Sequence, residues 1–161
     1  MDVYYDNGGN FIGTAHIYHD RQQEQWLSES MASRKNGDHI GLATKYTNAL
    51  ATDLKEIRAS YVGRGTKSMR LSLERSLINV QNSSVDLFYV HYWDSRTSIS
   101  ELMHALNDLV SSGKVNRGIS DASPWVVTKA NPYARDHGLR QFVVYQGMKY
   151  GASYLHWYRQ E

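Results

Sequence analysis

The chain has 161 residues, 41% of them hydrophobic and 21% charged, a composition close to that of ordinary soluble proteins. The formal net charge of +2 is too small to indicate a nucleic-acid surface, and no long apolar run indicates a membrane span. Because there is no cysteine, disulfide bonds and thiolate metal sites are excluded. We therefore expect one cytoplasmic domain with no metal, nucleic-acid or membrane partner.

The first predicted elements are a strand followed by a helix. Residues 10–15 form a short, mostly apolar run that is suited to a buried strand. Residues 20–35 are polar, with Trp26, Leu27 and Met31 at helical spacing, and an asparagine–glycine pair then supplies a helix stop. The chain is therefore expected to begin as a strand–helix unit.

A second strand and a second helix are separated by a long polar segment. Residues 39–44 are again mostly apolar and predict a strand. Residues 46–67 are polar and contain glycine, which is typical of a functional loop, so this segment is expected to lie over a site. In residues 68–81 four apolar side chains recur at steps of four, four and three, which predicts one buried face of a helix.

The second half of the chain continues the alternation. Residues 85–90 predict a third strand, and Ser98 with Glu101 has the spacing of a capping box that begins a helix. Gly113 is suited to end that helix. The remaining predicted elements are a strand at 115–119, a helix at 124–137 and a strand at 141–145.

This alternation predicts a parallel sheet, which is either doubly wound or an arc of an eight-stranded barrel. Periodicity does not separate the two, but the positions of polar residues favour the barrel. Barrel enzymes collect working residues from the carboxyl ends of many strands, whereas a doubly wound sheet binds at one switch point. Polar candidates follow all five predicted strands here, and they are Tyr18, Lys45, His91, Ser120 and Gln146. The expected fold is α/β, a partial (β/α)8 TIM barrel of about five parallel strands.

Several short segments resemble a known family. They are Gly8-Gly9-Asn10-Phe11-Ile12, Ala43-Thr44-Lys45-Tyr46, Tyr89-Val90-His91-Tyr92-Trp93-Asp94, Gly118-Ile119-Ser120-Asp121 and Tyr145-Gln146-Gly147. Over about residues 1–150 the chain resembles the aldo-keto reductases, and within them the fungal aryl-alcohol dehydrogenases. The resemblance implies NADP-dependent interconversion of aromatic aldehydes and alcohols, and it leaves residues 151–161 as a divergent tail.

Three residues match the reacting groups of that family. By the resemblance, Tyr18 is the proton donor, Lys45 is the lysine beside it and His91 positions the substrate carbonyl. The chemistry suits these roles, because a free tyrosine titrates near about pH 10 and needs a nearby ammonium to stabilise the phenolate it leaves behind. Hydride would come from the nicotinamide.

Five further residues match positions around the cofactor and substrate. By the resemblance, Ser120, Asp121 and Gln146 hold the nicotinamide carboxamide, Tyr145 lies under the nicotinamide ring and Trp93 walls the aromatic substrate pocket. The family often has asparagine where this chain has Asp121, and an aspartate accepts hydrogen bonds but donates none. Trp93 also suits plain packing, and Ser120 also suits a helix cap.

The chain departs from the family pattern in two respects. An aspartate that pairs with the lysine would stand five residues before Tyr18, where this chain has Gly13, so a slowed or abolished chemical step is expected. About half of a complete barrel, including the segment that binds the cofactor's adenosine phosphate, has no counterpart. The alternatives are a reductase completed by self-association, a non-catalytic remnant and an interaction subunit that pairs with a full-length relative.

Overall fold

The structure, a computed structural model, describes residues 1–46, 65–91, 93 and 97–147. Two of the sequence-based expectations lie outside these residues. They are the functional loop, of which residues 47–64 are not described, and the divergent tail at 151–161.

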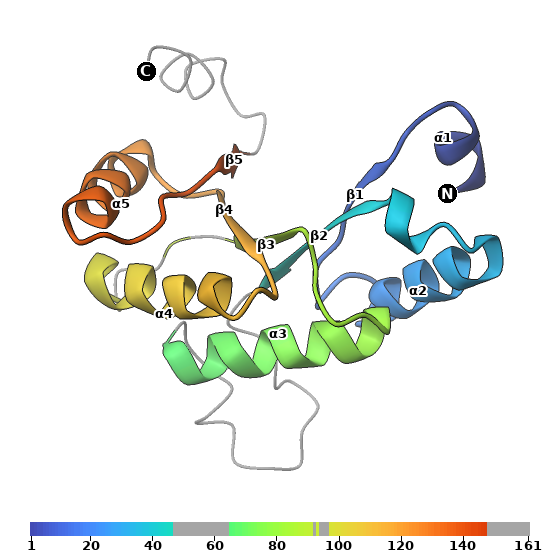
Figure 1. The fold of residues 1–161 in the computed structure, drawn as a ribbon, viewed down its shortest axis with the longest axis horizontal. Helices are drawn as coiled ribbons and strands as arrows, with labels where there is room; N and C mark the ends of the chain where they lie inside the picture. Colours follow the sequence, from blue (N-terminus) through green and yellow to red (C-terminus); the bar gives the residue numbers. More distant parts are fainter. Residues whose placement is uncertain (47–64, 92, 94–96, 148–161) are drawn as a thin grey trace.

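Five parallel strands form one sheet in which the strand order follows the chain order (Figure 1). The strands are β1 (Phe11–Gly13), β2 (Gly41–Tyr46), β3 (Leu87–Val90), β4 (Asn116–Ser120) and β5 (Val144–Gln146). Each strand pairs with the next one along the chain. This curved sheet with its alternating helices confirms the expected partial (β/α)8 barrel.

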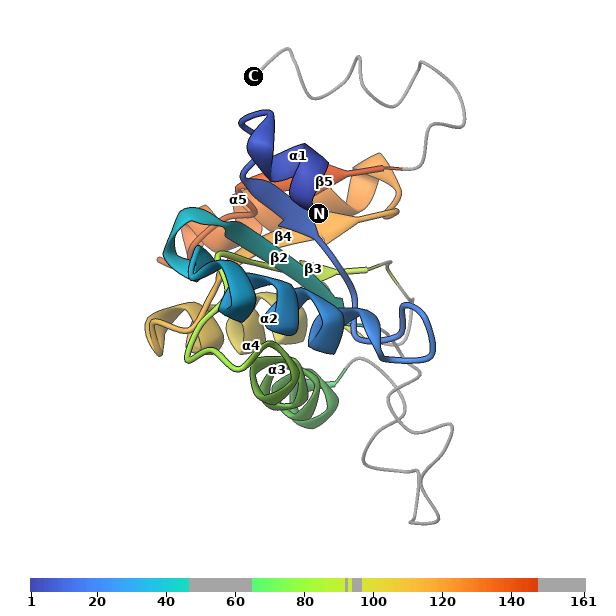
Figure 2. The ribbon, with the colours of Figure 1, turned by 90° about the vertical axis from the view of Figure 1, so that its right-hand side faces the viewer.

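Four helices follow one another along one face of the sheet, and Figure 2 shows α2, α3 and α4 on the same side. They are α2 (Gln23–Arg34), α3 (Thr66–Val80), α4 (Ile99–Ser111) and α5 (Pro124–Asp136). The predicted cap of α4 is present, because the Glu101 backbone N–H donates to the Ser98 hydroxyl at 3.1 Å. Pro124 begins α5, where a missing N–H costs nothing.

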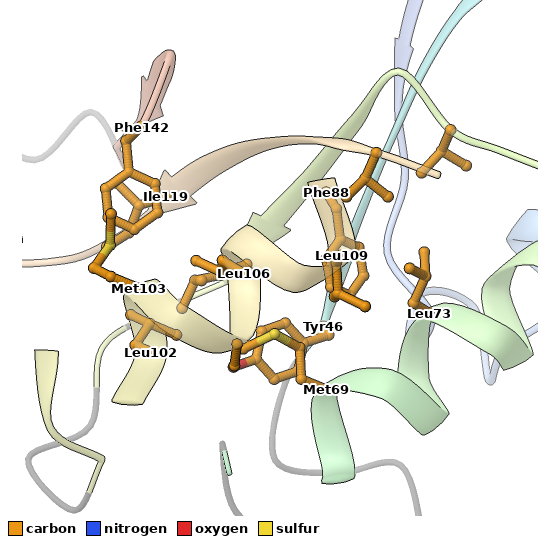
Figure 3. Close-up of a cluster of buried hydrophobic side chains, with 14 of the residues drawn as sticks. Tyr46, Met69, Leu73, Phe88, Leu102, Met103, Leu106, Leu109, Ile119 and Phe142 are labelled. Carbon is orange, nitrogen blue, oxygen red and sulfur yellow. The ribbon is translucent and has the colours of Figure 1, made fainter. Parts of the chain in front are cut away.

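The hydrophobic core lies between this helical layer and the sheet (Figure 3). The ring of Tyr46 stacks on that of Phe88, with centroids 5.4 Å apart, and both rings are fully buried. Side chains from α3 and α4 close over them, among them Met69, Leu73, Leu102, Leu106 and Leu109. Since alternate residues of a strand point to opposite faces, the odd-numbered residues of β2 are left for the inner face of the curve.

The short helix α1 (Asp2–Asp6) was not predicted from the sequence. It depends on tertiary contacts, since the guanidinium of Arg34 contacts the carboxylates of Asp2 at 2.9 Å and Asp6 at 2.8 Å. The Tyr5 hydroxyl also hydrogen-bonds to Nδ1 of His39 at 3.1 Å. A helix of about one turn is too short to show a periodic hydrophobic pattern in the sequence, so it becomes visible only through these contacts with distant residues.

Three local expectations were wrong. His39 lies in the 3-10 turn η1 (Gly37–His39), and the second strand begins only at Gly41. The last strand begins at Val144, because the backbone N–H of Phe142 donates to the Asn131 side chain of α5 instead of joining the sheet. Trp26 is 49% exposed, so the buried face of α2 excludes it.

Candidate active site

The inner face of the sheet carries the candidate site. Lys45 pairs in register with Tyr89, which in turn pairs with Gly118, so these three residues share the inner face. A side chain on Gly118 would meet the Tyr89 ring at 2.7 Å, and glycine is therefore what lets Tyr89 lie flat along this face. The sequence placed Lys45 just beyond its strand, whereas the structure places it within β2.

Lys45 is buried beside the hydroxyl of Tyr18. Its ammonium donates to the Tyr18 oxygen at 3.3 Å and to the Thr14 carbonyl at 3.2 Å, and the side chain is only 4% exposed. The rings of Tyr18 and Tyr89 lie 5.0 and 5.8 Å from the nitrogen, at cation–π distance. Because the ammonium donates to the phenol oxygen, the phenol keeps its own proton available for another acceptor.

An unusual turn fixes the backbone of Tyr18. The three residues that follow it, His19, Asp20 and Arg21, all have positive φ angles of 48°, 50° and 71°. Non-glycine residues rarely adopt this region, and such strain clusters at functional sites. The Arg21 backbone N–H returns to the Tyr18 carbonyl at 3.0 Å, so the strained turn holds Tyr18 in place.

His91 completes the cluster from the end of the third strand. Its backbone N–H donates to the Tyr46 carbonyl at 3.2 Å, which continues the ladder between β2 and β3. Its ring meets that of Tyr18 edge to face, with centroids 5.9 Å apart and an angle of 78° between the planes. The structure therefore brings Tyr18, Lys45 and His91 together, and their catalytic roles stay predictions.

The Lys45 ammonium has no carboxylate partner among the described residues. Gly13 lies on the same inner face, because its partner in the sheet, Ala43, is two residues before Lys45. A Cβ atom built on Gly13 would meet nothing within 4 Å. There is thus space for a side chain beside the buried ammonium, and the chain leaves it unfilled.

Three residues predicted to hold the nicotinamide carboxamide lie together at the ends of β4 and β5. Ser120 pairs in register with Gln146, and the Asp121 backbone N–H donates to the Gln146 carbonyl at 2.9 Å. The Ser120 hydroxyl donates to the Asp121 carboxylate at 3.4 Å. A hydroxyl and an amide can each donate and accept, and a carboxylate accepts, so this set fits a carboxamide.

Tyr145 and Trp93 are placed away from this cluster. Tyr145 alternates with Gln146 along β5, so it points to the opposite face, and its hydroxyl donates to the Ala122 carbonyl at 3.0 Å. Trp93 packs, partly buried, against the hydrophobic core. Their cofactor and substrate roles stay predictions.

The sequence reasoning missed a buried polar group behind the site. Glu24 is fully buried and accepts hydrogen bonds from the Thr44 hydroxyl at 2.7 Å and the Asn79 amide at 2.9 Å. A signal was present, because Glu24 stands three residues before Leu27 and seven before Met31, on the buried face of α2. A carboxylate on the buried face of a helix must find hydrogen-bond donors in the folded protein, because burying it without them is costly.

His16 is also buried, and its surroundings fix its protonation. Its Nδ1–H donates to the Lys45 carbonyl at 2.9 Å. Burial lowers the pKa of His16, which outweighs the opposite effects of that hydrogen bond and of the Glu24 charge. The ring is therefore neutral at pH 7 and serves as a fixed donor to the backbone of Lys45.

Neither a metal cluster nor a membrane-spanning helix is found within the described part of the chain. No three histidine, cysteine, aspartate or glutamate side chains there gather closely enough to hold a metal ion. No helix in the same residues is long and apolar enough to cross a membrane.

The fold and the cluster define a class: part of a (β/α)8 barrel with a tyrosine, a lysine and a histidine gathered at the carboxyl ends of its strands. The model of the aldo/keto reductase family matches residues 1–150. The chain belongs to the aldo/keto reductase family.

Several similar proteins are fungal reductases and dehydrogenases. The chain is 61% identical over 150 residues to norsolorinic acid reductase B of Aspergillus parasiticus, covering 92% of this chain and 39% of the relative. It is 48% identical over 154 residues to an aryl-alcohol dehydrogenase of Pestalotiopsis microspora, covering 95% and 40%. For the NADP(+) aryl-alcohol dehydrogenase of Phanerodontia chrysosporium the identity is 43% over 152 residues, covering 91% and 40%. The chain thus spans about two fifths of the length of these curated relatives.

Proposed function

We propose that this chain is an oxidoreductase that interconverts carbonyl compounds bearing an aromatic ring and the corresponding alcohols, with NADP as the cofactor. One observation carries the proposal, which is the Lys45 ammonium 3.3 Å from the Tyr18 hydroxyl, with the His91 ring against that tyrosine. Two of the relatives are named as an NADP(+) aryl-alcohol dehydrogenase and a norsolorinic acid reductase, and these names support the choice of cofactor and substrate class.

In this mechanism the protein supplies the proton. The Tyr18 hydroxyl donates to the carbonyl oxygen of the substrate, and Lys45 stabilises the negative charge that remains on the phenol oxygen. His91, at the edge of the Tyr18 ring, orients the carbonyl toward that hydroxyl. In the reverse direction the same oxygen takes the proton back from the alcohol.

The cofactor would lie across the ends of β4 and β5. Ser120, Asp121 and Gln146 would bind its carboxamide, since together they offer the donors and acceptors that this group requires. When bound, NADPH supplies hydride to the carbonyl carbon. Ser120 and Gln146 lie on the same inner face of the sheet as Lys45, so a cofactor bound there would be on the side of the reacting groups.

The direct test is the oxidation of NADPH by purified protein whose folding has been checked by circular dichroism. Benzaldehyde and norsolorinic acid would be the substrates, with NADH as the alternative cofactor. We expect turnover with NADPH and with at least one substrate. A folded protein that turns over neither substrate with either cofactor would overturn the proposal.

We expect Gly13→Asp to raise kcat by about tenfold, because errors in positioning a reacting group cost up to about 100-fold. The added carboxylate would reach into the open space beside Gly13 and pair with the buried Lys45 ammonium. Steady-state kinetics would measure the change. Gly13→Asn is the matched control, since it fills the same space without a charge. Equal rates for the two variants would contradict this explanation.

One observation favours a second candidate, an interaction subunit completed by a further copy or by a full-length relative. In the sheet of the described residues β1 and β5 are the two edges, and Phe11 on β1 is 47% exposed. Exposed edges of a sheet readily pair with another chain. Light scattering of the purified protein, alone and co-expressed with a relative, would detect a defined oligomer if this second role holds.

A further inference from the structure

Two consecutive residues at the start of α2 grip the ends of two neighbouring strands. Glu24 accepts a hydrogen bond from the Thr44 hydroxyl at 2.7 Å, and Gln23 accepts one from the Thr14 hydroxyl at 3.2 Å. We refer to Thr14, Gln23, Glu24 and Thr44 as the clasp. Its three members Thr14, Glu24 and Thr44 are completely buried.

Both strand ends held by the clasp are connected to Lys45, one by a hydrogen bond and the other by the chain itself. The Thr14 carbonyl accepts a hydrogen bond from the Lys45 ammonium at 3.2 Å. Thr44 directly precedes Lys45 in β2, and its side chain points to the helical face while that of Lys45 points inward. The clasp therefore contacts both backbone segments that place the ammonium beside Tyr18.

The first strand needs this support. It has only three residues, and as an edge of the sheet it is paired on one side alone. Beyond it, among the described residues, the hydrogen bonds of Thr14 to the Ala43 carbonyl and of the His16 backbone and ring to the Lys45 carbonyl lead toward Tyr18. A short edge strand frays easily, so the side-chain contacts from α2 add to what holds the segment that leads to the proton donor.

Stability alone explains Glu24 poorly. Its carboxylate is fully buried, and the two groups that donate to it, from Thr44 and Asn79, are both neutral. A buried charge without an opposite charge is costly, and an apolar side chain would usually fasten the helix at less cost. A fully hydrogen-bonded polar network does fix one geometry closely, which is what a reacting pair of side chains requires.

We propose that Gln23 and Glu24 are positioning residues that act through Thr14 and Thr44 to hold the Lys45 ammonium against the Tyr18 hydroxyl. The catalytic meaning of this inference rests on the proposed reductase function. The effect of the clasp on the contact between Lys45 and Tyr18 does not depend on that function. The clasp residue Thr44 lies on the helical face, opposite Lys45, so the effect of the clasp is on the distance between β1 and β2 at their carboxyl ends.

The chain offers a matched pair of variants as a test. Thr44→Val and Asn79→Leu each remove one hydrogen bond from the same Glu24 carboxylate, but only Thr44 adjoins Lys45. We expect both to lower the unfolding midpoint to a similar degree. Only Thr44→Val should lower kcat, by about tenfold, with KM changed by less than about twofold. Thr44→Ser, which restores the hydroxyl, should recover the rate.

A second readout does not depend on activity. The nuclear Overhauser effect between the Lys45 ε-methylene and the Tyr18 ring, assigned by its absence in Lys45→Met, reports their contact directly. It should weaken in Thr44→Val and persist in Asn79→Leu and Thr44→Ser. If Thr44→Val does not fold, Gln23→Leu tests the other half of the clasp by the same two readouts.

The outcomes separate the two proposals. If the wild-type protein has no turnover but Thr44→Val alone loses the Overhauser effect, the clasp stands and the reductase function fails. If the effect survives in both Thr44→Val and Gln23→Leu, or is lost equally in Asn79→Leu, the clasp proposal is overturned and Glu24 serves stability alone.

Discussion

Tyr18→Phe is expected to lower the rate of NADPH oxidation with an aromatic aldehyde by about 100- to 10,000-fold, the usual contribution of a positioned general acid. The substitution removes only the hydroxyl that receives the Lys45 hydrogen bond at 3.3 Å and keeps the ring that faces His91. Binding should change little, because the ring surface is unaltered. The loss should therefore appear in kcat and not in KM.

Tyr133→Phe is the matched control for that experiment. Tyr133 lies on α5 and its hydroxyl hydrogen-bonds to Nε2 of His104 at 3.3 Å, far along the chain from the cluster. Tyr133→Phe removes an equivalent hydroxyl from an exposed hydrogen bond, so the rate of this variant should equal that of the wild type. If Tyr18→Phe kept the wild-type rate, the measured turnover would arise from another site or another protein.

Phe88→Ala is expected to reduce the free energy of unfolding by about 3–5 kcal/mol, the usual cost of emptying a fully buried aromatic position. Phe88 lies in the centre of β3, has no exposed surface and stacks on Tyr46 (Figure 3). A loss of this size is comparable to the whole stability of many domains. Urea unfolding followed by tryptophan fluorescence would measure it.

Ile78→Ala on α3 controls for the general effect of removing an apolar side chain. Ile78 is 68% exposed, so its truncation should change the unfolding free energy by no more than about 0.5 kcal/mol. Equal losses for Phe88→Ala and Ile78→Ala would show that the layer between the sheet and α3 is not packed in solution as described.

The alternation of strand and helix could be predicted because each element carries its own local signal. The step of four, four and three in α3 and the capping box of α4 depend only on neighbouring residues. The boundaries of β1 and β5 could not be predicted in this way. An edge strand ends where its partner stops pairing, and Asn131 of α5 captures the backbone that leads into β5.

In the candidate site, too, some features could be predicted from the sequence and others depend on distant residues. The resemblance placed Tyr18, Lys45 and His91, and the structure brings them together. Glu24 was missed because a glutamate in a polar helix is normally solvated, and its burial depends on Thr44 and Asn79 of two other elements. The backbone of His19 to Arg21 was missed because positive φ is uncommon in non-glycine residues, so the moderate preference of histidine and aspartate for it does not predict three such residues in a row.

The matching of strand order to chain order has a consequence for how the molecule is made. Among the five described strands, each one from β2 onward pairs with the strand synthesised just before it, so none of these has to wait for a distant segment to leave the ribosome. Loop closure then always spans a single strand–helix–strand step, which keeps its entropic cost nearly constant along the chain. Translation itself can therefore assemble the sheet one unit at a time, as in a repeat protein.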